Sequence, residues 1–239
     1  MKNPICFALD FPDYDDAVRF IDGHKLREHI GAVKVGLELF IASGREAVIG
    51  FNAIQQLDVV LDLKLHDIPE TVERAVKVGG DLGAKYMTMH IQQRSTIERA
   101  VKAAEPFGIT MLGVTVLTSM TQSDCEDLML ASQRHDPTYC YPGERVISLA
   151  RFGYEHGMRG FVCSPQDVKE LKVVCPDAFF LVPGIRPTGA AVGDQKRVGT
   201  PGQAIKDGAS LLVIGRPIRD ATDPFKSTQD ILREINEAK

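Results

Sequence analysis

The chain has 239 residues, a length that fits a single α/β barrel. With 44% hydrophobic and 25% charged residues, its composition is that of a globular protein rather than a disordered or fibrous one. The formal net charge of −4 argues against nucleic-acid binding as the main role, because nucleic-acid-binding domains usually carry a basic excess.

Cysteine usage and hydropathy indicate where the protein works. The five cysteines are an odd number without a CxxC pair, which favours a reduced cytosolic chain over a disulfide framework. The apolar run before Asp10 is too short for a signal peptide. No apolar run approaches the roughly 20 residues that span a bilayer. We therefore expect a cytoplasmic protein that binds neither nucleic acid nor membrane.

Short apolar, β-rich runs alternate with helical patterns along the chain. Eight runs are expected to form strands, at 5–10, 32–38, 58–65, 86–91, 109–117, 160–164, 179–185 and 210–216. Helices are expected at 12–22, 44–56, 70–82, 94–106, 143–157, 165–172, 201–207 and 223–237. Prolines at the predicted starts of several helices support these assignments.

The alternation of strands and helices predicts a parallel sheet. Eight such units without a change in composition predict a closed (β/α)₈ TIM barrel, in which residues 1–239 form one domain. An open doubly wound sheet is the alternative, but the segment "ALDFPDYDD" after the first strand lacks a GxGxxG fingerprint. Two connections are long, 118–142 and 186–200, and we expect the second, rich in glycine and polar residues, to act as a lid.

Charged residues gather at the carboxyl ends of the first three predicted strands, where barrels carry their catalytic groups. These residues are Asp10, Lys34, Asp62, Lys64 and Asp67. Residues two apart on a strand point to the same face, so Asp62 and Lys64 should both face the barrel mouth, while Leu63 faces the helices. An isolated Asp-x-Lys would favour a structural ion pair, whereas five converging charges indicate a functional site.

The chemistry available to this cluster is restricted. It contains no His, Asp and Glu trio at metal-ligand spacing, and the sequence has no GxSxG elbow. Lys34 and Lys64 instead supply the positive charge that a metal would otherwise supply. Lys64 is the candidate general acid, because the carboxylates on either side keep it protonated and aimed.

Two glycine–arginine pairs follow the last two predicted strands. Gly184 and Arg186 lie in "VPGIRP", and Gly215 and Arg216 lie in "VIGRPI". The loops after strands seven and eight often form a phosphate site in this fold, where glycine lets backbone N–H groups approach and arginine donates a fork of hydrogen bonds. We therefore expect a phosphorylated ligand.

The segment "DLKLHDIPET" resembles the Asp-x-Lys-x-x-Asp-Ile-x-x-Thr signature of the orotidine 5′-monophosphate decarboxylase family. Five further segments resemble the family in the same order: "ALD" (8–10), "VKVG" (33–36), "GVTVLTS" (113–119), "VPGIRP" (182–187) and "VIGRPI" (213–218). The resemblance covers essentially the whole chain. It implies a TIM barrel that converts orotidine 5′-monophosphate to uridine 5′-monophosphate and carbon dioxide, with no metal or other cofactor.

Roles for individual residues follow from the resemblance. It implies that Lys64 protonates C6 of the pyrimidine as carbon dioxide leaves, and that Lys34, Asp62 and Asp67 complete a charged network around it. Asp67 and Thr71 match residues that reach the neighbouring subunit's site, which implies a homodimer.

The resemblance also implies a substrate-binding set. Asp10 and Lys34 would contact the ribose, Thr118 and Ser119 the base, and Gln195 both base and phosphate. Arg186, Gly215 and Arg216 would hold the phosphate. The rest of the set is the third-strand segment: Asp62, Leu63, Lys64, Leu65, His66, Asp67, Ile68, Pro69, Glu70 and Thr71.

Two alternatives remain open. The 3-keto-L-gulonate 6-phosphate decarboxylase family resembles the same third-strand pattern, but places a glutamate ligand for magnesium near the end of the second strand. Here that strand presents Lys34, and Glu38 follows four residues later. A barrel that binds phosphate without catalysis is the other alternative, although it gives no reason for Lys64 to stand between two aspartates. His90 is expected to be a hydrogen-bonded core residue.

Overall fold

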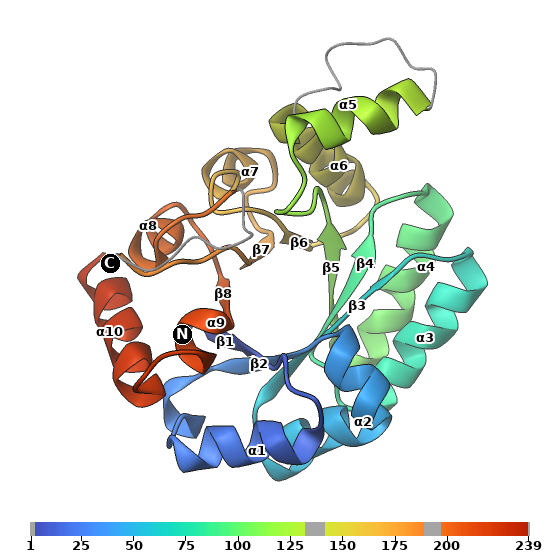
Figure 1. Ribbon diagram of the computed structural model, residues 1–239. Helices are drawn as coiled ribbons and strands as arrows, with labels where there is room; N and C mark the ends of the chain where they lie inside the picture. Colours follow the sequence, from blue (N-terminus) through green and yellow to red (C-terminus); the bar gives the residue numbers. More distant parts are fainter. Residues whose placement is uncertain (1–2, 132–141, 189–196, 239) are drawn as a thin grey trace.

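The computed structural model describes residues 3–131, 142–188 and 197–238. Eight parallel strands close into a barrel in sequence order (Figure 1). They are β1 (Ile5–Ala8), β2 (Ala32–Val35), β3 (Asp58–Leu65), β4 (Tyr86–His90), β5 (Thr110–Val114), β6 (Gly160–Val162), β7 (Phe179–Val182) and β8 (Leu211–Ile214). Pairing of Cys6 in β1 with Val213 in β8 closes the ring. The predicted barrel is confirmed, and the open sheet is excluded.

Helices surround the barrel (Figure 1). They are α1 (Tyr14–Gly23), α2 (Leu37–Ile49), α3 (Pro69–Asp81), α4 (Arg94–Ala104), α5 (Gln122–Ala131), α6 (Pro142–Glu155), α7 (Val168–Val174), α8 (Pro201–Lys206), α9 (Arg216–Arg219) and α10 (Pro224–Glu237). Side chains fix several helix starts: Asp13 accepts a hydrogen bond from the N–H of Asp16, and Asp223 accepts one from the N–H of Lys226.

The second strand–helix unit differs from the sequence prediction. The strand expected at 32–38 ends at Val35, and the helix expected at 44–56 begins at Leu37. Gly44, expected to begin the helix, is a kink inside it with a φ of 53°, a conformation that glycine adopts at little cost. A π-helical turn, Gly50–Ile54, follows. A glycine that looked like a boundary is thus a bend within one longer helix.

Two apolar layers stabilise the barrel. The inner core is made of small and branched residues that point to the barrel axis: Cys6, Ala8, Ala32, Val60, Leu112, Leu181, Leu211 and Val213. The outer core lies between strands and helices, and includes Phe7, Val59, Met87 and Phe180. Because the strands are buried on both faces, they appear in the sequence as nearly continuous apolar runs.

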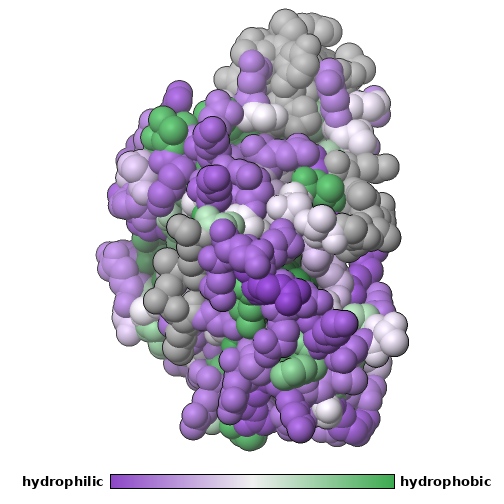
Figure 2. Space-filling view, turned by 90° about the vertical axis from the view of Figure 1, so that its left-hand side faces the viewer, coloured by the Kyte–Doolittle hydropathy of each residue, from purple (hydrophilic) through white to green (hydrophobic). Residues whose placement is uncertain are grey.

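The described residues show no extended apolar patch on the side where α8 and α10 lie (Figure 2). Figure 2 shows this side as mostly hydrophilic, with hydrophobic residues in small separate patches. Within the described ranges, no helix is both long and apolar enough to cross a lipid bilayer.

Candidate active site

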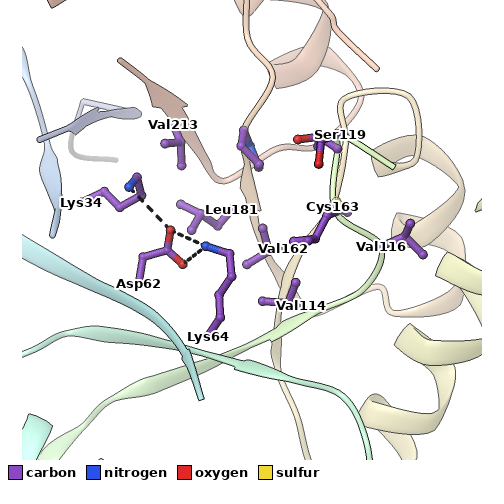
Figure 3. A pocket seen from close by; sticks show the side chains of 13 residues that line it. Lys34, Asp62, Lys64, Val114, Val116, Ser119, Val162, Cys163, Leu181 and Val213 are labelled. Atoms are coloured by element: carbon purple, nitrogen blue, oxygen red, sulfur yellow. Dashed lines mark hydrogen bonds and ion pairs between the residues drawn. The ribbon is translucent and has the colours of Figure 1, made fainter. Parts of the chain in front are cut away.

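A cavity of about 250 Å³ opens at the carboxyl ends of the strands. Its lining comes from six strands and the segments after them: Lys34, Asp62, Lys64, Val114, Val116, Leu117, Thr118, Ser119, Val162, Cys163, Leu181, Pro183 and Val213. Charged groups from β2 and β3 form one side, apolar side chains from β5 to β8 form the walls, and Ser119 lies across the cavity from Asp62 (Figure 3). The cavity therefore combines a charged edge with apolar walls.

The charged edge is a chain of alternating ions. The Nζ of Lys64 lies 2.9 Å from each carboxylate oxygen of Asp62. The Nζ of Lys34 lies 3.6 Å from Asp62 Oδ2 and 3.6 Å from Asp10 Oδ1. Side-chain exposure is 12% for Asp62 and 14% for Lys34, so these charges meet with little water between them. Four of the five charged residues expected at the barrel mouth, Asp10, Lys34, Asp62 and Lys64, therefore converge.

The ionisation of Asp62 follows from its neighbours. Burial alone would raise the pKa of this carboxyl group, but the charges of Lys34 and Lys64 and the hydrogen bonds from Lys64 and Thr88 outweigh burial. The pKa of Asp62 is therefore lowered from its ordinary value, and the residue is an anion at neutral pH. An anion between two ammonium groups removes the repulsion that would otherwise separate them.

The backbone of β3 is irregular where it carries this ion pair. Leu61 pairs with Met87 and Leu65 pairs with Met89, so four steps along β3 face only two steps along β4. Within this bulge Lys64 has a φ of 50°, in the left-handed region that few residues other than glycine adopt. Strained backbone of this kind gathers at functional sites. Simple strand alternation predicted the contact between Asp62 and Lys64 but not this conformation.

Thr88 is a site residue that sequence reasoning missed. Its side chain is buried on β4, where its hydroxyl donates to Asp62 Oδ1 at 2.9 Å and accepts from the backbone N–H of Lys64 at 2.9 Å. The signal that could have found it is the alternation of β4, which turns Tyr86, Thr88 and His90 toward the barrel interior. Thr88 is the residue on that face with a short side chain that ends in a hydroxyl.

Asp67, predicted to join the charged network, faces solvent in the single chain. Its Oδ1 accepts from the N–H of Ile68 at 2.7 Å, and its carbonyl accepts from Gln92 Nε2 at 3.0 Å. In the described part of the chain it forms no ion pair with Lys34 or Lys64. The single chain therefore brings three of the four predicted catalytic side chains together.

The other residues of the third-strand segment are spread around the mouth. Leu63 and Leu65 pack against the outer core. His66 is exposed, and its ring lies 5.3 Å from that of His90. His90 is half-buried rather than a core residue, and burial, followed by the electrostatic effect of His66 and Lys64, lowers its pKa. Ile68 precedes α3, and Pro69, Glu70 and Thr71 form its first turn.

The candidate phosphate residues lie after β7 and β8, as predicted. Gly215 precedes the short helix α9, which begins with the exposed Arg216. The half-buried Arg186 donates from its backbone N–H to the carbonyl of Gly199 at 2.9 Å, which ties together the two ends of the connection after β7. Gln195 lies outside the described residues.

An ion pair that the sequence did not reveal links three connections at the mouth. Arg197 Nη1 lies 2.8 Å from Asp167 Oδ2, and Arg197 Nη2 donates to the carbonyl of Val116 at 3.2 Å. The same Asp167 oxygen accepts from Ser164 Oγ at 2.7 Å. Both charged side chains are nearly buried, at 12% and 11% exposure. This clamp, Arg197 with Asp167, holds the segment that carries Thr118 and Ser119.

The fold and the cavity define a (β/α)₈-barrel enzyme with a charged network at the carboxyl ends of its strands. A sequence model described as the orotidine 5′-phosphate decarboxylase / HUMPS family matches residues 3–231. The chain belongs to this family.

Relatives named orotidine 5′-phosphate decarboxylase match along almost their full length. The protein from Sphingopyxis alaskensis is 40% identical, with 97% of this chain and 98% of that protein covered. The one from Anaeromyxobacter dehalogenans is 42% identical, with 95% and 96% covered. Among solved structures, orotidine 5′-phosphate decarboxylase from Lactobacillus acidophilus is similar with a TM-score of 0.79 and 30% identity, over 98% of this chain and 99% of that one.

We expect Arg197→Met to lower the free energy of unfolding by about 3–5 kcal/mol, because it leaves the nearly buried Asp167 carboxylate without its cation. Denaturant titration measures the change. Arg233→Met is the matched control: it breaks an exposed ion pair with Asp230 on α10 and should change stability by no more than about 0.5 kcal/mol. Equal changes in the free energy of unfolding for the two substitutions would show that the clamp stabilises the protein no more than an exposed ion pair does.

Proposed function

We propose that the protein decarboxylates orotidine 5′-monophosphate to uridine 5′-monophosphate, the last step in making this pyrimidine nucleotide. Membership of the family and the full-length relatives of that name support the proposal. The observation that carries it is the Lys64 ammonium, held by both oxygens of Asp62 at the edge of an apolar cavity.

The reaction requires a cation next to one carbon atom. When the bond between C6 and the carboxylate breaks, the electron pair stays on C6 in the plane of the ring, where no ring orbital can delocalise it. Stabilisation must then come from a preorganised positive charge. In the proposed mechanism Lys64 supplies that charge and donates its proton to C6, and it regains a proton from solvent after product release.

Each neighbouring group has a defined part in this proposal. Asp62 fixes the Lys64 ammonium, and Lys34, beside Asp10, hydrogen-bonds the ribose. The apolar walls from β5 to β8 lower the local dielectric constant, which strengthens the interaction between the ammonium and the developing carbanion. Ser119 hydrogen-bonds the amide edge of the base from the far side of the cavity.

The phosphate supplies binding energy at a distance from the reacting carbon. In the proposal Arg186, Gly215 and Arg216 hold this group, and Gln195 reaches both the base and the phosphate. Binding of a part of the substrate that does not react can be used to lower the barrier at the part that does.

The proposed reaction needs no metal, because Lys34 and Lys64 already provide positive charge at the reacting centre. The alternative is a magnesium-dependent decarboxylase of keto-sugar phosphates, for which a glutamate near the end of the second strand would be a metal ligand. In the structure Glu38 is exposed in the first turn of α2, beyond the end of β2. Lys34, which does line the cavity, is already paired with Asp10 and Asp62.

We further propose a homodimer in which Asp67 and Thr71 complete the partner's site. Asp67 lies at the mouth yet points to solvent in the single chain. Exposed hydrophobic residues follow β3 and its neighbour β2: Ile68 is 62% exposed, and Leu37 and Ile41, one turn apart on α2, are 54% and 81% exposed. A twofold interface over this region would cover apolar surface and bring a carboxylate to each partner.

Replacement of Lys64 by alanine tests the catalytic assignment. We expect conversion of orotidine 5′-monophosphate, followed by ultraviolet absorbance, to fall by at least about 10²- to 10⁴-fold, because the general acid is lost. Lys169→Ala, at an exposed position on α7, should retain wild-type activity. No conversion by the wild type, or full activity in Lys64→Ala, would overturn the proposal.

Treatment with a chelator separates the proposed reaction from the magnesium-dependent alternative. We expect full activity with orotidine 5′-monophosphate after dialysis against EDTA, because lysines provide the charge. Added magnesium should not raise the rate. Loss of activity in EDTA that magnesium restores would favour the alternative.

Mixing of two inactive variants tests the contribution from the partner subunit. Lys64→Ala and Asp67→Asn should each be inactive as homodimers, whereas a mixed dimer contains one site with both native residues. We expect mixing, with subunit exchange followed by native mass spectrometry, to restore activity. Mixed dimers without activity would contradict the role of Asp67 in trans, and a purely monomeric protein would contradict the dimer.

A further inference from the structure

Thr88 contacts both residues of the ion pair between Asp62 and Lys64. It lies on β4, inside the barrel, and is 1% exposed. One hydrogen bond joins its hydroxyl to the Asp62 carboxylate and another joins it to the backbone N–H of Lys64, both at 2.9 Å. The Thr88 hydroxyl thus contacts the side chain of Asp62 and the backbone of Lys64.

The direction of these bonds is fixed by chemistry. The N–H of Lys64 can only donate, so the Thr88 oxygen must accept. The ionised Asp62 can only accept, so the single hydroxyl proton must point to it. The orientation of the hydroxyl proton is therefore fixed, because neither hydrogen bond can be reversed. Its orientation therefore locks the carboxylate and the strand bulge to each other.

The bulge gives the second bond its importance. Lys64 has a positive φ, and its N–H lies in the stretch where pairing between β3 and β4 skips two residues of β3. A buried backbone N–H needs a partner, and here Thr88 Oγ1 takes the place of a strand carbonyl. The place from which the Lys64 side chain leaves the strand is set by this bond.

We propose that Thr88 is a positioning residue for decarboxylation. Its two hydrogen bonds, to the Asp62 carboxylate and to the backbone N–H of Lys64, align the Lys64 ammonium with Asp62. The inference rests on the proposed function. Thr88 does not line the cavity, so it is expected to act through Lys64 and Asp62 and not by touching the substrate.

The test compares Thr88→Val with Thr88→Ser. Valine keeps the shape and removes both hydrogen bonds, whereas serine keeps the hydroxyl. We expect kcat for orotidine 5′-monophosphate to fall by about 10- to 100-fold in Thr88→Val, the effect of a small misplacement of a reacting group. KM and the affinity for uridine 5′-monophosphate should stay near wild-type values, because ribose and phosphate contacts are untouched. Thr88→Ser should restore most of kcat.

Thr228→Val is the matched control. Thr228 is also fully buried, on α10, and its hydroxyl donates to the carbonyl of Pro224 at 2.8 Å. It is not among the residues that line the cavity. Its replacement should lower the melting temperature without lowering kcat. If Thr88→Val is too unstable to purify, Thr88→Ala is measured in the same way, below its melting temperature.

The outcomes separate two failures. If wild-type protein does not convert orotidine 5′-monophosphate, the proposed function fails, and this inference about turnover fails with it. If the wild type is active and Thr88→Val, or Thr88→Ala in its place, keeps wild-type kcat, only the inference about Thr88 is overturned. A parallel loss in kcat and in nucleotide affinity, not rescued by serine, would also overturn it by showing a general structural role.

Discussion

The carboxylate of Asp62 lies between two ammonium groups, and the mouth of the barrel is arranged around that contact. Without an anion there, Lys34 and Lys64 would repel each other in a site with little water. Burying such ions is expensive unless their geometry is good and their remaining hydrogen-bonding sites are filled. The bulge in β3 and the hydroxyl of Thr88 meet that requirement. The bulge lets the Lys64 ammonium reach both oxygens of Asp62, and the Thr88 hydroxyl donates a further hydrogen bond to Oδ1 of Asp62.

The two ends of the barrel interior differ: one is an apolar core, and the other carries the charged cavity. Toward the amino ends of the strands, small and branched side chains such as Ala32, Val60 and Leu211 pack together as an apolar core. Toward the carboxyl ends, charged groups come from β2 and β3, while Val114 and Val162 continue the apolar lining on the other side. The asymmetry places Lys64, the proposed general acid, beside apolar walls, where a low dielectric constant would strengthen the effect of its charge.

The barrel and the charged cluster could be predicted from the sequence because both follow from period-two alternation and chain order. Asp62 and Lys64 appear two apart on an apolar strand, and eight strand–helix units admit few topologies. The contacts of Thr88 and Arg197 and the conformation of Lys64 could not be predicted in this way, because they depend on which residues of distant segments face each other. The pairing of β3 with β4 skips residues without any local sign such as glycine. The prediction at Gly44 was wrong for the opposite reason: the glycine suggested the start of a helix, but it only bends α2.

Closure of the ring by β1 and β8 has a consequence for the newly made chain. Asp10 follows the first strand and Arg216 follows the last, and the carbonyl of Asp10 accepts a hydrogen bond from Arg219, 209 residues away in sequence. Residues from both extremes of the chain therefore meet at one rim, and a nascent chain without β8 leaves β1 unpaired along one edge. Because synthesis proceeds from the amino terminus, the ring of strands can close only after β8, the last strand, has been made.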